Sequence, residues 1–147
     1  MAKVFISYSR KDIESAKRLT AELQKSDFDF WIDWEGIPPT VDWWKEIEKA
    51  IEESDVFIFL ISPDSARSRV CKQELEYAVQ NGKRLIPVVV RATEAVEIPS
   101  ELEHLNYIFL REQDNFVTSL TTLLTAIKTD YEWAATHRRL QVKALEP

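Results

Sequence analysis

The chain contains very little glycine: among its 147 residues, only Gly36 and Gly82 are glycines. The glycine-rich dinucleotide fingerprint and the P-loop both need several glycines at short spacing to approach phosphate closely. Gly36 and Gly82 are too far apart in the sequence to form either loop. The composition therefore excludes both phosphate-binding loops, and a nucleotide that binds here must be held by another arrangement.

Cysteine and histidine are also scarce, with one cysteine, Cys71, and two histidines, His104 and His137. A single cysteine cannot form a disulfide within the chain, and it excludes a zinc site built from several cysteines. Hydrolases with a serine or cysteine nucleophile need a base beside it, usually histidine. One histidine falls in a late loop and the other in the C-terminal tail, so we expect neither this hydrolase chemistry nor a metal site. The single cysteine, which leaves no disulfide to form, also suggests a cytoplasmic protein.

Long apolar runs are absent: none approaches the roughly 18 residues of a membrane-spanning helix. The first residues, Met-Ala-Lys-Val, begin a predicted strand rather than a signal peptide. The net charge of −6 argues against nucleic acid as the main partner. Hydrophobic residues make up 45% of the chain, which suits one globular domain of ordinary size. We therefore expect one domain that binds neither a membrane nor nucleic acid.

Short apolar segments alternate with amphipathic ones along most of the chain. Apolar runs predict five strands, at residues 3–8, 28–32, 56–61, 84–90 and 106–110. Apolar residues at helical spacing predict helices between these strands and after the last one. This alternation predicts an α/β, flavodoxin-like fold, in which a doubly wound five-stranded parallel sheet has the order 2-1-3-4-5 and carries helices on both faces.

The third predicted strand and the helix after it are the most strongly patterned part of the chain. Val56–Ile61 is apolar throughout, as expected for a strand buried on both faces, and Pro63 should end it. A polar loop should follow, and then a helix from about Val70. On that helix Cys71 lies on the apolar face as a small buried residue, whereas Glu74 falls at the boundary of that face, half shielded from solvent.

The predicted topology places these residues near one another. In a sheet of this order, ligands bind outside the carboxyl ends of the first and third strands. These ends are Tyr8-Ser9-Arg10 and Ser62-Pro63-Asp64. The crevice should therefore gather Arg10, Ser62 and Glu74. A phospho-acceptor receiver domain is excluded, because it needs an acidic pair after the first strand, where this chain has Ser9-Arg10.

Five tryptophans are more than the core of one small domain should need, and aromatic residues are enriched at interfaces. The helical register with Ile47 and Ile51 predicts that Trp44 is a core residue. Trp43 is then available to stack on a ligand or to contact another protomer, and so is Trp34 in the preceding loop. We therefore expect an assembly surface that includes Trp34 or Trp43.

The chain resembles the Toll/interleukin receptor (TIR) domain, most of all its bacterial members. The resemblance rests on five motifs in order: VFISYSRKD, FWIDWEGIPP, WKEIEKAIEESDVFIFLISPDS, VCKQELEYAV and GKRLIPVVV. The resemblance as a whole covers about residues 3–128, so we expect a TIR domain over residues 1–128. Residues 129–147 are more basic and are predicted to be a helical linker or tail towards a domain absent from this chain.

The family contains adaptors that signal by TIR–TIR assembly and enzymes that cleave NAD+. The enzymes carry their catalytic glutamate in the helix after the third strand, which implies that Glu74 is catalytic in an assembly-dependent NAD+ nucleosidase. NAD+ is then the substrate, no cofactor is needed, and the products are nicotinamide with ADP-ribose or a cyclic form. The resemblance also implies antiviral defence signalling in bacteria. Its implied partners are other TIR protomers, in a homo-oligomer or filament, and a fused sensor or repeat domain.

The resemblance implies two further groups of residues. The substrate-binding group is Tyr8, Ser9, Arg10, Asp33, Ile37, Ser62 and Cys71. The assembly group is Trp34, Gly36, Pro38 and Trp43. Val70 stands where many NAD+-cleaving members carry a tryptophan, four residues before the glutamate. Because valine cannot stack on a base as tryptophan can, the alternative is a non-catalytic TIR–TIR interaction module.

Overall fold

A computed structural model gives the fold, and it describes residues 2–26, 28–32 and 42–129. The strands are β1 (Lys3–Ser7), β2 (Asp29–Trp31), β3 (Val56–Ile61), β4 (Arg84–Val89) and β5 (Ile108–Phe109). The α-helices are α1 (Ile13–Lys25), α2 (Trp43–Glu53), α3 (Pro63–Arg67) and α4 (Arg69–Gln80), and residues 116–129 are also helical. The short 3₁₀ helices are η1 (Arg10–Asp12), η2 (Ala95–Glu97) and η3 (Ser100–Leu102). Within these described ranges, no helix has the length and apolar character needed to cross a bilayer.

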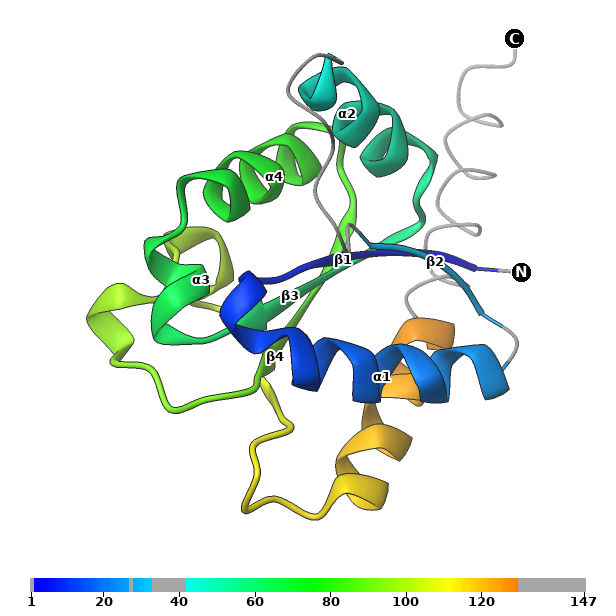
Figure 1. Cartoon of the computed structure of the whole chain (residues 1–147), viewed down its shortest axis with the longest axis vertical. Coiled ribbons are helices and arrows are strands. Elements are labelled where there is room, and N and C mark those ends of the chain that lie inside the picture. Colours follow the sequence, from blue (N-terminus) through cyan, green and yellow to red (C-terminus); the bar gives the residue numbers. More distant parts are fainter. Residues whose placement is uncertain (1, 27, 33–41, 130–147) are drawn as a thin grey trace, which may run out of the picture.

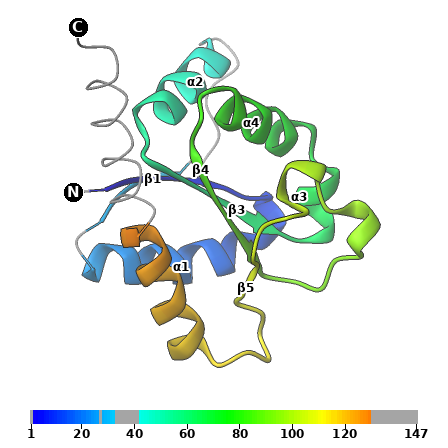
Figure 2. The same ribbon diagram turned by 180° about the vertical axis from the view of Figure 1, so that it is seen from behind.

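The strands form one parallel sheet in the order β2-β1-β3-β4-β5, which confirms the predicted topology (Figures 1 and 2). Every residue of β3 is buried, as its continuous apolar run predicted. The edge strand β5 is shorter than the predicted strand at residues 106–110. The sheet order therefore brings the carboxyl ends of β1 and β3 together, where a doubly wound fold holds its ligands.

Alternate side chains of β1 pack into different halves of the core. Val4 and Ile6 join the cluster under α1 and the helix of residues 116–129, whereas Phe5 joins the cluster under α2 and α4. Figure 1 shows these two pairs of helices on opposite faces of the sheet. The rings of Trp31, Phe5 and Phe57 stack across β2, β1 and β3, with centroids 4.9 Å and 5.3 Å apart. A row of stacked rings therefore supports the face covered by α2 and α4.

The segment after β3 is helical where a polar loop was predicted. Ser62 accepts a hydrogen bond from the backbone N–H of Ser65, and the Ser65 hydroxyl accepts one from the N–H of Ser62. Pro63 occupies the first helical position, where its missing N–H costs nothing. This capping box starts α3, and Ser68 then caps α4. The prediction was wrong here because a five-residue helix is too short to show an apolar period.

Candidate functional site

A cavity of about 340 Å³ opens at the carboxyl edge of the sheet, between the end of β1, α2 and the beginning of α4. Its volume lies in the lower part of the range found for small-molecule sites. The structure brings most of the described candidate residues to this cavity. The lining residues are Ile6, Tyr8, Ser9, Arg10, Trp31, Trp43, Ile47, Ser68, Val70, Cys71 and Glu74.

Glu74 places a carboxylate on the wall of this cavity although the residue is only 7% exposed. It is more deeply buried than the half-shielded position that the helical period predicted. Its Oε1 accepts a hydrogen bond from the Ser7 hydroxyl at 2.8 Å. The helix start is held as well, because Ser68 accepts the backbone N–H of Cys71 at 3.2 Å. A carboxylate held in this way can stabilise positive charge on a molecule in the cavity.

Cys71 lines the same cavity and is buried. Burial, and next to it the negative charge of Glu74, raises the pKa of the Cys71 thiol to about 11. The thiol is therefore protonated at neutral pH, whereas the thiolate is the nucleophilic form of cysteine. The structure thus agrees with the interpretation of Cys71 as a small buried residue.

Aromatic side chains form much of the cavity wall. Trp31 comes from β2 and is held by its stack on Phe5, and Trp43 comes from α2. Trp44, the predicted core residue of the pair, is half-buried and packs against the cluster under α2 and α4; Trp43 is half-buried against the same cluster and faces the cavity. Trp44 packs edge-on against Trp43 and Tyr77, at centroid distances of 5.9 Å and 6.1 Å.

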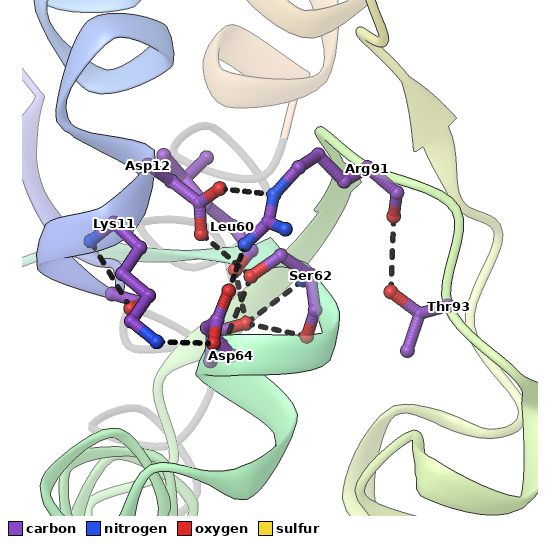
Figure 3. A network of polar contacts seen from close by, with 9 residues as sticks. Lys11, Asp12, Leu60, Ser62, Asp64, Arg91 and Thr93 are labelled. Carbon is purple, nitrogen blue, oxygen red and sulfur yellow. Dashed lines mark hydrogen bonds and ion pairs between the residues drawn. The ribbon is translucent and has the colours of Figure 1, made fainter.

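A buried polar network lies behind the loop that carries Ser9 and Arg10. The Asp12 carboxylate, whose side chain is 2% exposed, accepts a hydrogen bond from Arg91 Nε at 2.6 Å. Its other oxygen accepts a hydrogen bond from the Ser62 hydroxyl, also at 2.6 Å (Figure 3). Because Arg10 and Asp12 belong to the same short helix η1, this network holds one wall of the cavity in place.

Asp64 extends the network towards solvent. It pairs with the Nη2 of Arg91, and with Lys11 at 3.4 Å (Figure 3). The hydrogen bond from Arg91, followed by the contact with Lys11, holds the pKa of the Asp64 carboxyl below its usual range. The two aspartates therefore join η1, α3 and the segment after β4 around a single guanidinium group.

Ser62 does not line the cavity, although it was predicted to bind substrate. The residue is fully buried, and its side chain is engaged with Asp12 and with the first turn of α3. The topology placed Ser62 at the correct edge of the sheet. It could not show that the hydroxyl faces η1 and α3 instead of the cavity, because that depends on how these segments pack.

Five predicted site residues fall outside the residues that the structure describes: Asp33, Trp34, Gly36, Ile37 and Pro38. The predicted tail from residue 130 onwards does so too. Their proposed roles in substrate binding, assembly and linkage therefore stay predictions. Among the described residues, no three acidic, cysteine or histidine side chains are grouped as a metal site would require.

Several residues at the site were not predicted: Ile6, Trp31, Ile47 and Ser68 line the cavity, and Ser7 hydrogen-bonds Glu74 behind its wall. Ser7 has a signal in the sequence, since it is a polar residue directly after the apolar run of residues 4–6. Ile47 lies one turn after Trp43 and lines the cavity with it. Trp31 has no such signal, because its place depends on the pairing of β2 with β1.

Comparison of the sequence with protein families gives one match that spans most of the chain. The matching family is described as TIR domain, and the match runs over residues 4–124. Among curated proteins, none matches the chain.

Solved structures show the same fold at low sequence identity. The TIR domain of the Toll-related receptor TRR-2 from Hydra magnipapillata has a TM-score of 0.73 and 23% identity, over 87% of this chain and 99% of that one. The TIR domains of the activated Roq1 resistosome have a TM-score of 0.69 and 16% identity, over 86% and 99%. The CMP N-glycosidase BcmB from Clostridium botulinum has a TM-score of 0.56 and 17% identity, over 82% and 97%. At these identities the likeness shows a shared fold.

Proposed function

Because this chain belongs to the TIR domain family, we propose that it cleaves NAD+ at the bond between nicotinamide and ribose when TIR protomers assemble. The observation that carries the proposal is the buried carboxylate of Glu74 on the wall of an aromatic-lined cavity. NAD+ is the substrate. Within the same proposal, a fused sensor or repeat domain triggers assembly in the cytoplasm, and the reaction serves antiviral defence signalling.

The chemistry of NAD+ explains how one carboxylate can be sufficient. Glycosidases usually need two carboxyl groups, because one must protonate the leaving oxygen. The nicotinamide ring of NAD+ is already a cation, so the C1′–N bond breaks, its electron pair goes to the ring nitrogen, and neutral nicotinamide leaves. Positive charge then develops on the ribose, where Glu74 can stabilise it. Water that bonds to C1′ and loses a proton gives ADP-ribose, whereas capture by the adenine gives a cyclic form.

The cavity walls suit the two ends of this substrate. Trp31, Trp43 and Tyr8 offer ring surfaces to the nicotinamide, and aromatic faces attract a cationic ring. Arg10 is exposed and offers a guanidinium group to the diphosphate. A protein of the same fold is a CMP N-glycosidase, so this architecture can support cleavage of an N-glycosidic bond.

Nicotinamide release from NAD+ tests the proposal, measured at high protein concentration or with a crowding agent that promotes assembly. We expect Glu74→Gln, which removes the charge and keeps the shape, to lower the rate by about a hundredfold or more. The matched control is Glu76→Gln, on the exposed side of the same helix, which should keep the wild-type rate. Equal rates in the two variants would exclude the role of Glu74. Absence of release from assembled wild-type protein would exclude the activity.

A non-catalytic TIR–TIR interaction module is the second candidate, and Val70 favours it. Val70 lines the cavity and is 41% exposed, yet its small side chain offers a planar base little surface for stacking. Such a module would self-associate without releasing nicotinamide, and Glu74→Gln would leave its association unchanged. Sedimentation velocity and the nicotinamide assay on the same samples distinguish the two candidates.

A further inference from the structure

Glu74 has a buried hydrogen-bond partner outside the predicted site residues. Ser7, the last residue of β1, is fully buried, and its Oγ donates to Glu74 Oε1 at 2.8 Å. The two residues are 67 positions apart in the sequence. Their contact therefore joins the end of a central strand to the first turns of α4, where the cavity opens.

The alternation of β1 explains why Ser7 points towards α4. Phe5, two residues earlier, packs into the cluster under α2 and α4, together with Cys71 and Leu75. Side chains two residues apart on a strand share a face of the sheet, so Ser7 faces α4 as Phe5 does. An apolar side chain would fill this interior position equally well. The hydroxyl of Ser7 instead faces the polar groups of α4, where it donates to the Glu74 carboxylate.

The hydroxyl acts most strongly on the charged form of Glu74. A carboxylate loses solvation when it is buried, and a hydrogen-bond donor offsets part of that loss while the group is ionised. Hydrogen bonds to ionised groups are about twice as strong as those between neutral groups, and they also fix orientation. The Cys71 thiol also lies within hydrogen-bond reach of the Ser7 hydroxyl, but burial and the charge of Glu74 raise the pKa of this thiol to about 11, so Glu74 is the charged one of the two partners.

We propose that Ser7 is a positioning residue for Glu74, whose hydroxyl keeps the carboxylate ionised and directed at the cavity. Its effect on turnover rests on the proposed NAD+ cleavage. Ser7 is not part of the cavity lining, so it acts through Glu74 and does not touch the substrate. Three other titratable groups share the described cavity wall with Glu74: Tyr8 and Arg10 after β1, and Cys71 on α4. From α2, the lining residues are Trp43 and Ile47, which do not titrate.

Three serine variants test this role through the pH profile of nicotinamide release. Ser7→Ala removes the hydroxyl and Ser7→Thr retains one. Ser54→Ala is the matched control, because it removes a buried hydroxyl that bonds only locally, to the Ile51 carbonyl at 2.7 Å. In Ser7→Ala we expect kcat to fall about tenfold with little change in KM, since a hydrogen bond to a charged group is lost. The acid limb of the profile should move to higher pH, because a carboxylate that has lost one of its hydrogen bonds takes up a proton more readily.

Two controls separate this role from a structural one. Ser7→Thr should return both kcat and the acid limb towards the wild-type values, and Ser54→Ala should keep them there. A uniform loss of rate in Ser7→Ala with an unmoved acid limb would overturn the proposal, and so would an equal shift in Ser54→Ala.

A direct titration keeps the test independent of turnover. Carbon NMR of protein labelled at glutamate side chains identifies the Glu74 signal by comparison with Glu74→Gln. The titration midpoint of this signal should rise in Ser7→Ala and return in Ser7→Thr. An unchanged midpoint in Ser7→Ala overturns the role of Ser7, whatever the activity. If the midpoint moves but wild-type protein releases no nicotinamide, Ser7 is supported and the proposed NAD+ cleavage fails.

Discussion

Asp12 Oδ1 and Arg91 Nε lie 2.6 Å apart, although 79 positions separate the two residues in the sequence. Asp12 ends the short helix η1 that also contains Arg10, and Arg91 follows the end of β4. Ser62, just after β3, donates to the second oxygen of the same carboxylate. This contact therefore ties the loop after β1, which forms one wall of the cavity, to the ends of β3 and β4.

Replacing Arg91 by alanine should destabilise the domain, because the buried Asp12 carboxylate would lose its charged partner. We expect the free energy of unfolding to fall by about 2–3 kcal/mol, measured by denaturant titration. Arg111→Ala is the control, since its partly exposed pair with Asp114 joins residues only three positions apart and should contribute about 1 kcal/mol or less. Equal losses in the two variants would contradict the special role of the Asp12 contact.

Asp64 should make the domain sensitive to acid. The hydrogen bond from Arg91, and then the contact with Lys11, holds the pKa of the Asp64 carboxyl below its ordinary value of 3.8. Such a carboxyl has a lower pKa in the folded state than in the unfolded state. It therefore stabilises the fold at pH values above its unfolded-state pKa, and this stabilisation is lost as the pH falls through its folded-state pKa.

The melting temperature should therefore fall on acidification below about pH 4, and less steeply in Asp64→Asn than in the wild type. Calorimetry across acidic pH measures this slope. The exposed residue Glu53 provides the control, and Glu53→Gln should keep the wild-type slope. The prediction fails if Asp64→Asn also keeps it.

Cys71 should report the charge of Glu74, and as the only cysteine it gives an unambiguous signal. Burial and, second, the carboxylate of Glu74 raise the pKa of the thiol to about 11. Glu74→Gln removes the second cause, so the thiol should alkylate faster at mildly alkaline pH, while burial still keeps its pKa above the free value of about 8.5. Mass spectrometry measures the alkylation rate against pH. A wild-type thiol that titrates like free cysteine would contradict this assignment.

Trp43 and Trp44 are adjacent but should differ in their effects. Trp43 lines the cavity, whereas Trp44 packs against Tyr77. Loss of stacking costs about 1–3 kcal/mol per base, so Trp43→Ala should raise KM for NAD+ about tenfold. Trp44→Ala should lower the melting temperature and leave KM near the wild-type value. KM for NAD+ and the melting temperature are measured for both variants. A raised KM in Trp44→Ala with an unchanged KM in Trp43→Ala would contradict this assignment.

Local patterns in the sequence determined the architecture. The apolar run Val56–Ile61 predicted a strand buried on both faces, and β3 is one. Alternation of strands and helices predicted the sheet order, because parallel strands joined by helices pack in few ways. Glu74 could be placed near the carboxyl edge for the same reason, since it lies on α4, which follows the central strand β3 and the short helix α3. These inferences need only periods of two and 3.6 residues and the rules of chain connection.

Only the tertiary structure decided which polar groups meet. The pairing of Ser7 with Glu74 and that of Asp12 with Arg91 depend on register and helix packing, which no local period encodes. Packing also decided that the ring of Trp43 faces the cavity, and that the Ser62 hydroxyl faces Asp12 instead of the cavity. The sequence by itself thus determined the fold and the position of the catalytic candidate. The geometry around that carboxylate arose from contacts between segments far apart in the chain, because a buried charge needs partners that only packing brings within reach.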